Sequence, residues 1–255
     1  MNIDRNHIQC TFAAYTDKYD STDPKIKLKI DHTYRVAALC DQISDSLNLS
    51  DNDKDLAWCL GMFHDIGRFE QIKRFGTFND ATSIDHARLS ADLLFIDNLI
   101  ESYSCNPSSE EARIIELAIR QHNQFRLPEE LTDRELLFCN IIRDADKIDI
   151  LKVNVETPAE SIYNISLQEL KQSKITPEVI DMFYTKSAVL RSLKRAPIDN
   201  LVGHISLVFE LVFPISRIIV KNQGYLDIML DFKSDNPDTN DEFMKMKAFM
   251  DQFLS

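Results

Sequence analysis

Residues 62–68, with the sequence MFHDIGR, place an imidazole beside a carboxylate at the end of an apolar stretch. We expect a helix to end here, because Gly67 readily adopts the left-handed conformation that closes a helix. Successive residues of a helix project about 100° apart. His64 and Asp65 can therefore approach one bound ion only if the end of this helix faces a cavity.

Other imidazole and carboxylate side chains occur in, or at the edge of, further apolar helical patterns. The candidates are His32, His86, His122 and Asp146. Together with His64 they bring four of the 6 histidines into one candidate site. An adjacent His-Asp pair is common by chance, and it is these additional imidazole and carboxylate side chains that indicate a binding site for an ion.

Imidazole combined with carboxylate suits a divalent transition metal better than calcium, which prefers oxygen ligands alone. Iron, manganese, cobalt, nickel and zinc all remain open. One ion would have four protein ligands in His32, His64, Asp65 and Asp146. If His86 and His122 join, the set suffices for two ions, with Asp65 as the bridge. Two ions about 3.5–4 Å apart can activate a water and neutralise a phosphoryl oxygen.

The elements that must position these residues are predicted to be helices throughout. With 5 glycines and 8 prolines, the chain has little of the turn chemistry that many short strands require. Asp85 is expected to cap a helix that begins at His86, and His122 is expected to close the next one. The apolar periods place helices at about residues 6–19, 24–47, 51–65, 86–96, 110–122, 133–152, 177–186, 198–220 and 241–253. Residues 68–83 lose this period and mix cations with aromatics, which predicts an irregular wall.

The composition excludes some partners. A net charge of -12 argues against extended nucleic acid, because phosphate-backbone binding needs a basic surface. No stretch of 18 uncharged apolar residues is present, so no membrane association is expected. The 5 cysteines form no CxxC, which is typical of reduced thiols in a cytoplasmic protein. A homo-oligomer is left open.

The order His32, His64-Asp65, Asp146 resembles that of the HD-domain metal-dependent phosphohydrolase superfamily. The segments FHDIGR and DADKID look like its HD motif and its final aspartate motif, and the resemblance covers about residues 26–152. It implies an all-α helical bundle with the ions in a pocket between helices. It also implies that Asp146, in an Ala-Asp-Lys unit, is the last ligand. His86 and His122 fall where two-metal members carry additional histidines.

These patterns predict two parts of the chain. Residues 1–153 are expected to form an HD-domain core with an N-terminal helix. Residues 154–255 are expected to form a helical extension packed on that core, because the segment 198–220 is too apolar to stand exposed.

Cations and aromatics beside the ligand motifs favour a small phosphorylated substrate. Arg68 and Lys147 are predicted to stabilise developing charge, and with Asp65 they make up the predicted catalytic set. Arg68 could equally pair with a carboxylate of the site. The predicted substrate contacts are Arg68, Arg74 and Arg126 to phosphate, Gln71 to a base by hydrogen bonding, and Phe75 and Phe78 to a base by stacking.

The resulting hypothesis is hydrolysis of a small, nucleotide-like phosphate ester by a metal-activated water. Two alternatives belong to other classes. Some HD-fold enzymes with six such ligands are mixed-valence di-iron oxygenases, which need two irons and dioxygen. The third reading is an HD module that senses a nucleotide without catalysis, which intact ligands disfavour.

Overall fold

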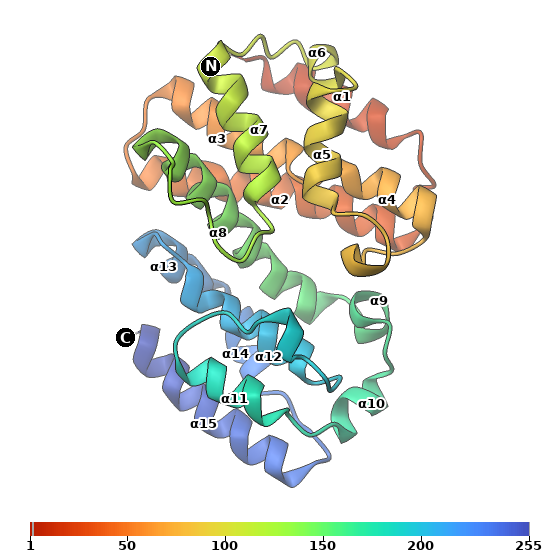
Figure 1. The fold of residues 1–255 in the computed structure, drawn as a ribbon, viewed down its shortest axis with the longest axis vertical. Coiled ribbons are helices and arrows are strands. Elements are labelled where there is room, and N and C mark those ends of the chain that lie inside the picture. Colours follow the sequence, from red (N-terminus) through yellow and green to blue (C-terminus); the bar gives the residue numbers. More distant parts are fainter. Residues whose placement is uncertain (2, 255) are drawn as a thin grey trace. The chain divides into compact units, whose positions relative to one another are not determined.

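The structure is a computed structural model that describes Met1 and residues 3–254. Every regular element in this part is a helix, so the predicted all-α fold is confirmed (Figure 1). The chain divides into two compact units, Met1–Asp146 and Lys147–Ser255. The predicted boundary after residue 153 falls inside a helix and stays a prediction, as does the packing of the extension on the core.

The first unit carries every residue of the predicted metal set. Its elements are α1 (Arg5–Thr16), α2 (Pro24–Ser46), α3 (Asp51–Phe63), α4 (Gly67–Phe75), the 3-10 turn η1 (Asp80–Thr82), α5 (His86–Phe95), α6 (Leu99–Ser102) and α7 (Ser109–Gln121). Helix α8 (Asp133–Glu156) begins in this unit and continues beyond it.

Side-chain caps define where several of these helices begin. The Asp23 carboxylate, just before Pro24, accepts a hydrogen bond from Lys25 N–H at the start of α2. The Asp85 carboxylate accepts hydrogen bonds from two N–H groups at the start of α5. Ser108 begins α7 with a capping box completed by Glu111. Such caps satisfy N–H groups that have no partner within the helix and contribute about 1 kcal/mol each.

The core of the first unit is built around α2 and α3, which pack closely along each other. Gly61 makes this approach possible, because a Cβ there would lie 2.4 Å from Cα of Ala37. Val36, Ile43 and Leu60 are fully buried in this core. Burial of each such side chain contributes about 1.5–3 kcal/mol. The tight contact fixes α2 against the C-terminal end of α3, which is where the candidate site begins.

The prediction for Gly67 is wrong. Gly67 is the first residue of α4 rather than the left-handed end of α3, and Gly76, with φ of 68°, closes α4 instead. Glycine is required at position 67 for a different reason. A Cβ there would lie 2.6 Å from the backbone nitrogen of Ser90 in α5, whose Oγ accepts a hydrogen bond from Gly67 N–H.

The irregular wall predicted for residues 68–83 is also wrong in its first half. Residues Gly67–Phe75 form the helix α4, because Phe69 and Ile72 lie one turn apart and are both buried. Phe69 packs edge-on against the ring of Phe12 in α1 at 5.8 Å. A helix with only two turns shows too few apolar residues for its period to stand out in the sequence.

The second unit is a separate set of short helices. They are α9 (Ala159–Tyr163), α10 (Leu167–Gln172), α11 (Pro177–Tyr184), the turn η2 (Arg191–Leu193), α12 (Asp199–Ser206), the turn η3 (Leu207–Glu210), α13 (Pro214–Gln223), α14 (Tyr225–Leu230) and α15 (Pro237–Leu254). The predicted helices at 177–186 and 241–253 correspond to α11 and α15. The single predicted helix at 198–220 is wrong, because Pro214 lacks an N–H group and starts a new helix after an extended segment.

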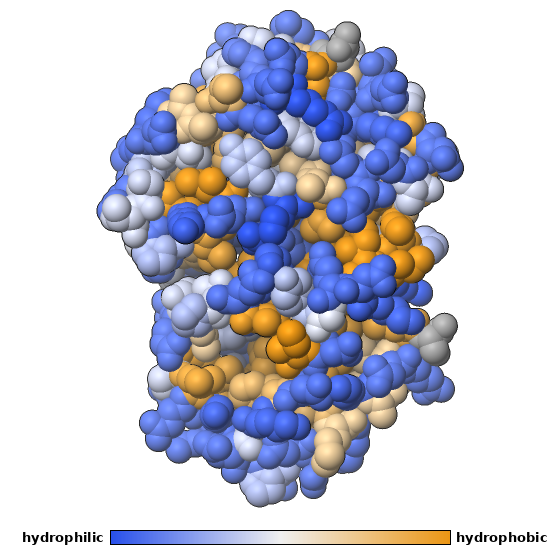
Figure 2. Space-filling view, turned by 180° about the vertical axis from the view of Figure 1, so that it is seen from behind, coloured by the Kyte–Doolittle hydropathy of each residue, from blue (hydrophilic) through white to orange (hydrophobic). Residues whose placement is uncertain are grey.

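The surface is mostly hydrophilic on the face drawn in Figure 2, with hydrophobic side chains in separate patches. Large exposed apolar residues include Phe75 and Ile96 in the first unit and Val212 and Met244 in the second. Within the described residues, none of the helices combines the length and the apolar character that a membrane span requires. The five cysteines are free, and all of them except Cys10 are buried.

Candidate metal centre

The structure brings all six predicted ligands together in the first unit. His32 Nε2 lies 3.2 Å from Oδ1 of Asp146 and 3.2 Å from Nε2 of His64. The same nitrogen lies 3.5 Å from Oδ2 of Asp65. We call these four residues the first position.

Asp65 also belongs to a second group of donors, through its other oxygen. Asp65 Oδ1 lies 3.4 Å from Nε2 of His86 and 3.8 Å from Nε2 of His122. The two histidine nitrogens are 3.0 Å apart. Three donors within ligand distance of one another could hold an ion, and we call them the second position. Asp65 therefore lies between the two positions, as a bridging carboxylate would.

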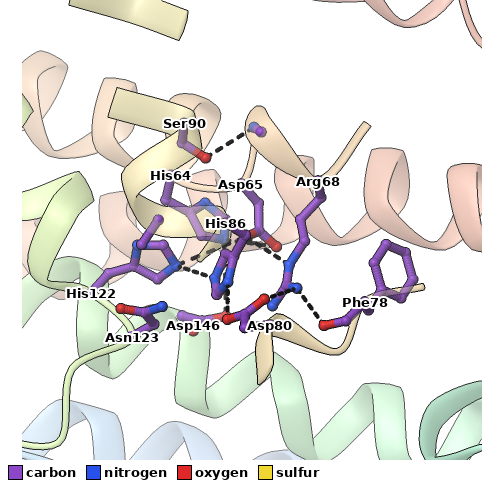
Figure 3. A network of polar contacts seen from close by, with 12 residues as sticks. His64, Asp65, Arg68, Phe78, Asp80, His86, Ser90, His122, Asn123 and Asp146 are labelled. Atoms are coloured by element: carbon purple, nitrogen blue, oxygen red, sulfur yellow. Dashed lines mark hydrogen bonds and ion pairs between the residues drawn. The ribbon is translucent and has the colours of Figure 1, made fainter. Parts of the chain in front are cut away.

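Three of these residues lie at helix ends, which converge on the site (Figure 3). His64 is the C-cap of α3, His86 is the first residue of α5, and His122 is the C-cap of α7. His32 lies within α2 and Asp146 within α8. The site is thus assembled from separate helices and depends on the fold of the whole unit.

Hydrogen bonds at Nδ1 orient the rings of His64, His86 and His122. The His64 Nδ1 atom lies 2.8 Å from Gly61 O, and the His122 Nδ1 atom lies 2.7 Å from Ile119 O. His86 Nδ1 lies 2.6 Å from Oδ2 of Asp80. Because these partners are acceptors, each Nδ1 carries the proton, and the lone pair of each Nε2 faces the centre.

The surroundings keep the rings of His86 and His122 neutral and the Asp65 carboxylate ionised. Burial lowers the pKa of His86 to about 4, assisted by the charge of Arg68. Burial, with the neighbouring His64, lowers the pKa of His122 to about 4. Burial alone would raise the pKa of Asp65, but the charge of Lys29, with other nearby cationic groups, holds it well below its usual value. These are the protonation states that metal ligands require.

Two observations show that a divalent cation fits this donor set. The Oδ1 atom of Asp65 is buried and has no hydrogen-bond partner, which is costly for an ionised oxygen. The Nε2 atoms of His86 and His122 face each other at 3.0 Å with neither carrying a proton. A cation among these atoms would satisfy all three, and the mixture of imidazole and carboxylate suits a transition metal.

Lys29 is a neighbour of the site that the sequence interpretation missed. Its Nζ lies 2.6 Å from Oδ2 of Asp65, and its side chain is only 16% exposed. The available signal was its spacing, because Lys29 precedes His32 by three residues and so lies on the same face of α2. Lys29 supplies a positive charge directly against the Asp65 carboxylate.

Arg68 is held in a fixed orientation beside the second position. Its Nη1 donates to Gln71 Oε1 and Phe78 O at 2.8 Å and to Oδ1 of Asp80 at 2.9 Å. Its Nε lies 3.5 Å from Asp65 Oδ1 without a hydrogen bond. The guanidinium also lies 5.5 Å from the centre of the Phe78 ring. Arg68 therefore pairs with carboxylates of the site and remains next to the ligands.

Two other predicted substrate contacts, Gln71 and Phe78, lie against Arg68. Gln71 is fully buried, and its amide is engaged by Arg68, Asp80, Ser83 and Ile84, so a contact with a base would require these bonds to break. Phe78 is half-buried, with Lys29 Nζ 5.5 Å from the centre of its ring.

The remaining predicted residues are Arg74, Phe75, Arg126 and Lys147. Arg74, expected in a loop, lies in α4 and pairs with Glu70 at 2.9 Å. Phe75 is 47% exposed at the end of α4, and Arg126 lies over the ring of Phe125. Lys147 follows Asp146 directly in α8 and is half-buried. Their roles in substrate binding or catalysis stay predictions.

Arg143 is a further residue that the structure places beside a ligand. It is buried in α8, and its Nη1 donates to Gln121 O at 3.0 Å and to His122 O at 3.4 Å. These bonds satisfy carbonyl groups that the end of α7 leaves without a helical partner. Arg143 therefore secures the helix end that presents His122.

Comparison with known proteins agrees with this geometry. A model of the HD domain family matches residues 30–151, a segment that contains all six donors. None of the curated proteins and none of the solved structures that were compared gives a significant match. The resemblance to the HD-domain metal-dependent phosphohydrolase superfamily that the sequence predicted is thereby confirmed for residues 30–151.

Proposed function

We propose that this protein is a metal-dependent phosphohydrolase that cleaves a small, nucleotide-like phosphate ester. The observation that carries the proposal is the convergence of four histidines and two aspartates in one site, in which one oxygen of Asp65 is buried without a hydrogen-bond partner. His32, His64, Asp65 and Asp146 would hold one divalent ion, and Asp65, His86 and His122 would hold a second. Such ions supply an acidified water and neutralise charge on phosphoryl oxygens.

The cations around the site support a phosphorylated substrate. Lys29 and Arg68 flank Asp65 on its two oxygens, and both are less than one-fifth exposed. Arg68 is already oriented by Asp80 and by the carbonyl of Phe78, so it would not have to reorganise as charge develops. Preorganised cations stabilise an anionic transition state more strongly in a buried site than in water.

Hydrolysis of the ester forms a bond from a water oxygen to phosphorus and breaks the bond from phosphorus to the ester oxygen. The departing oxygen takes up a proton that the attacking water gives up, and the phosphoryl oxygens carry negative charge in the transition state. Arg68 is proposed to stabilise that charge, and Lys147 stays a predicted contributor beside Asp146. The centre of the Phe78 ring lies 5.5 Å from the Lys29 ammonium and 5.5 Å from the Arg68 guanidinium, which supports Phe78 as a contact for a base.

Phosphate release from a panel of nucleotides and simple phosphate esters, with Mn²⁺ or Fe²⁺, tests the proposal. We expect Asp65→Ala to abolish turnover and Arg68→Gln to lower kcat by about 10²–10³-fold. Lys73→Gln, an exposed residue of the same helix as Arg68, is the matched control and should retain activity. Absence of turnover on the whole panel, with metal shown to be bound, would refute the proposal. Oxygen consumption that requires two irons would instead identify the oxygenase alternative.

A further inference from the structure

Asp80 lies outside the donor set but is bonded to three residues around it. Its Oδ2 accepts from His86 Nδ1 at 2.6 Å (Figure 3). Its Oδ1 accepts from Arg68 Nη1 and from Gln71 Nε2, both at 2.9 Å. Two donors therefore hold one oxygen in place, and the other oxygen is aimed at the imidazole.

The position of His86 explains why it needs such a partner. His64 and His122 lie at the C-terminal ends of helices, and each ring donates to a carbonyl three residues earlier. His86 is the first residue of α5, so no preceding turn of that helix offers a carbonyl to its Nδ1. The acceptor must come from another segment, and the turn η1 supplies it as Asp80.

We propose that Asp80 is a positioning residue for the second position, which consists of Asp65, His86 and His122. The inference rests on the metal centre of the proposed function. The Asp80 carboxylate fixes the ring of His86 and makes its Nε2 a stronger donor, as carboxylates beside metal-bound histidines do. In the described part of the chain, the Asp80 side chain contacts His86, Arg68 and Gln71, and His86 belongs to the second position alone.

Titration of the full, metal-stripped chain with Mn²⁺ tests this selectivity without any substrate. Calorimetry counts the bound equivalents, and electron paramagnetic resonance detects a coupled pair of ions. We expect the wild-type protein to bind two equivalents. Asp80→Ala should bind the first equivalent of Mn²⁺ with a Kd within twofold of the wild-type value. Binding of the second equivalent should weaken by about 10–100-fold, and the resonance signal of the coupled pair should disappear.

Asp80→Asn is the conservative variant and decides the question if Asp80→Ala fails to fold. Its amide nitrogen must face a donor, either His86 or the pair Arg68 and Gln71, so a smaller but measurable weakening of the second equivalent is expected. Two controls separate positioning from general damage. Thr82→Ala alters an exposed residue of the same turn, and Asp97→Asn removes an exposed carboxylate after α5. Both should bind two equivalents.

Three results would overturn the inference. If the wild-type protein binds a single equivalent of Mn²⁺, there is no second position for Asp80 to support. Equal loss of both equivalents in the Asp80 variants would indicate a merely structural role, and wild-type binding by both variants would indicate no role. These metal titrations do not measure turnover, so they can be interpreted even if no substrate of the phosphate-release panel is hydrolysed. Conversely, a protein that binds one ion could still be a hydrolase.

Discussion

The Nε2 atom of His32 lies 3.2 Å from Oδ1 of Asp146, although the two residues come from α2 and from α8. No local structure can create this contact, because most of the first unit lies between them in the sequence. It forms only when α2, α3 and α8 share one core. The first position is therefore a product of the folded unit, and its metal affinity should follow the integrity of that fold.

Removal of either partner of this contact should remove the ion from the first position. We expect His32→Ala and Asp146→Asn to weaken binding of the first Mn²⁺ equivalent by at least about 100-fold, more than the loss of a ligand's hydrogen-bond partner costs. Calorimetric titration measures the change. His7→Ala, an exposed histidine of α1, is the control. Unchanged binding in both variants would exclude these residues as ligands.

Gly67 should be the more sensitive of two glycines at the ends of α4. In Gly67→Ala the new methyl would lie 2.6 Å from the Ser90 backbone nitrogen, so α4 or α5 must move. We expect a loss of about 2–3 kcal/mol in the free energy of unfolding. Gly76→Ala meets nothing within 4 Å and strains only its φ of 68°, which costs about 1 kcal/mol. Urea unfolding compares them, and an equal or reversed order would contradict the close approach.

Lys29 should stabilise the metal-free protein and oppose metal binding. Lys29→Met leaves the buried Asp65 carboxylate without its nearest cation. We expect the metal-free protein to lose about 3 kcal/mol of stability. Removal of the repelling charge should also tighten Mn²⁺ binding by about tenfold. Thermal unfolding and calorimetry measure the two effects, with Lys27→Met on the exposed face of α2 as control. Weaker metal binding in Lys29→Met would show that this account of Lys29 is wrong.

Lys194 should give the second unit a stability that rises with pH. Its side chain packs against Gly203, and burial, with the charge of Arg191, lowers its pKa from 10.5 to about 8. Between these values the unfolded chain holds a proton that the folded chain has lost, so raising the pH favours the folded state. Relative to Lys194→Met, the wild-type protein should gain about 2 kcal/mol between pH 7 and pH 10.

Lys194→Met should therefore be more stable than the wild-type protein at pH 7, and this difference in stability should shrink as the pH rises. Unfolding by urea at several pH values measures the difference. Lys233→Met, at an exposed lysine of the same unit, should show no such trend. A difference between wild type and Lys194→Met that is constant with pH would mean that the ammonium is not desolvated by folding.

The sequence was sufficient for the fold class and for most helices of the first unit. Apolar periods and the cap at Asp85 are local features, and they are strong because each helix has one buried face. The six ligands could be collected because their residue types and order are distinctive. That each of them lies within 4 Å of another depends on tertiary packing, and only the structure shows it.

The errors arose where tertiary contacts decide the outcome. Gly67 was interpreted from the conformational freedom of glycine, whereas its place in the fold is set by the approach of Ser90. Asp80 lies in a segment without periodicity, so nothing local links it to His86. Lys29 becomes significant only once α2 lies against the turn that carries Asp65. The break at Pro214 was readable locally, and the apolar character of residues 198–220 outweighed it.

The most direct test of the account is an anomalous difference map from crystals of the full chain grown with Mn²⁺. The account predicts one peak among His32, His64, Asp65 and Asp146 and a second among Asp65, His86 and His122. Manganese bound elsewhere on the protein, with no peak among these six side chains, would contradict it.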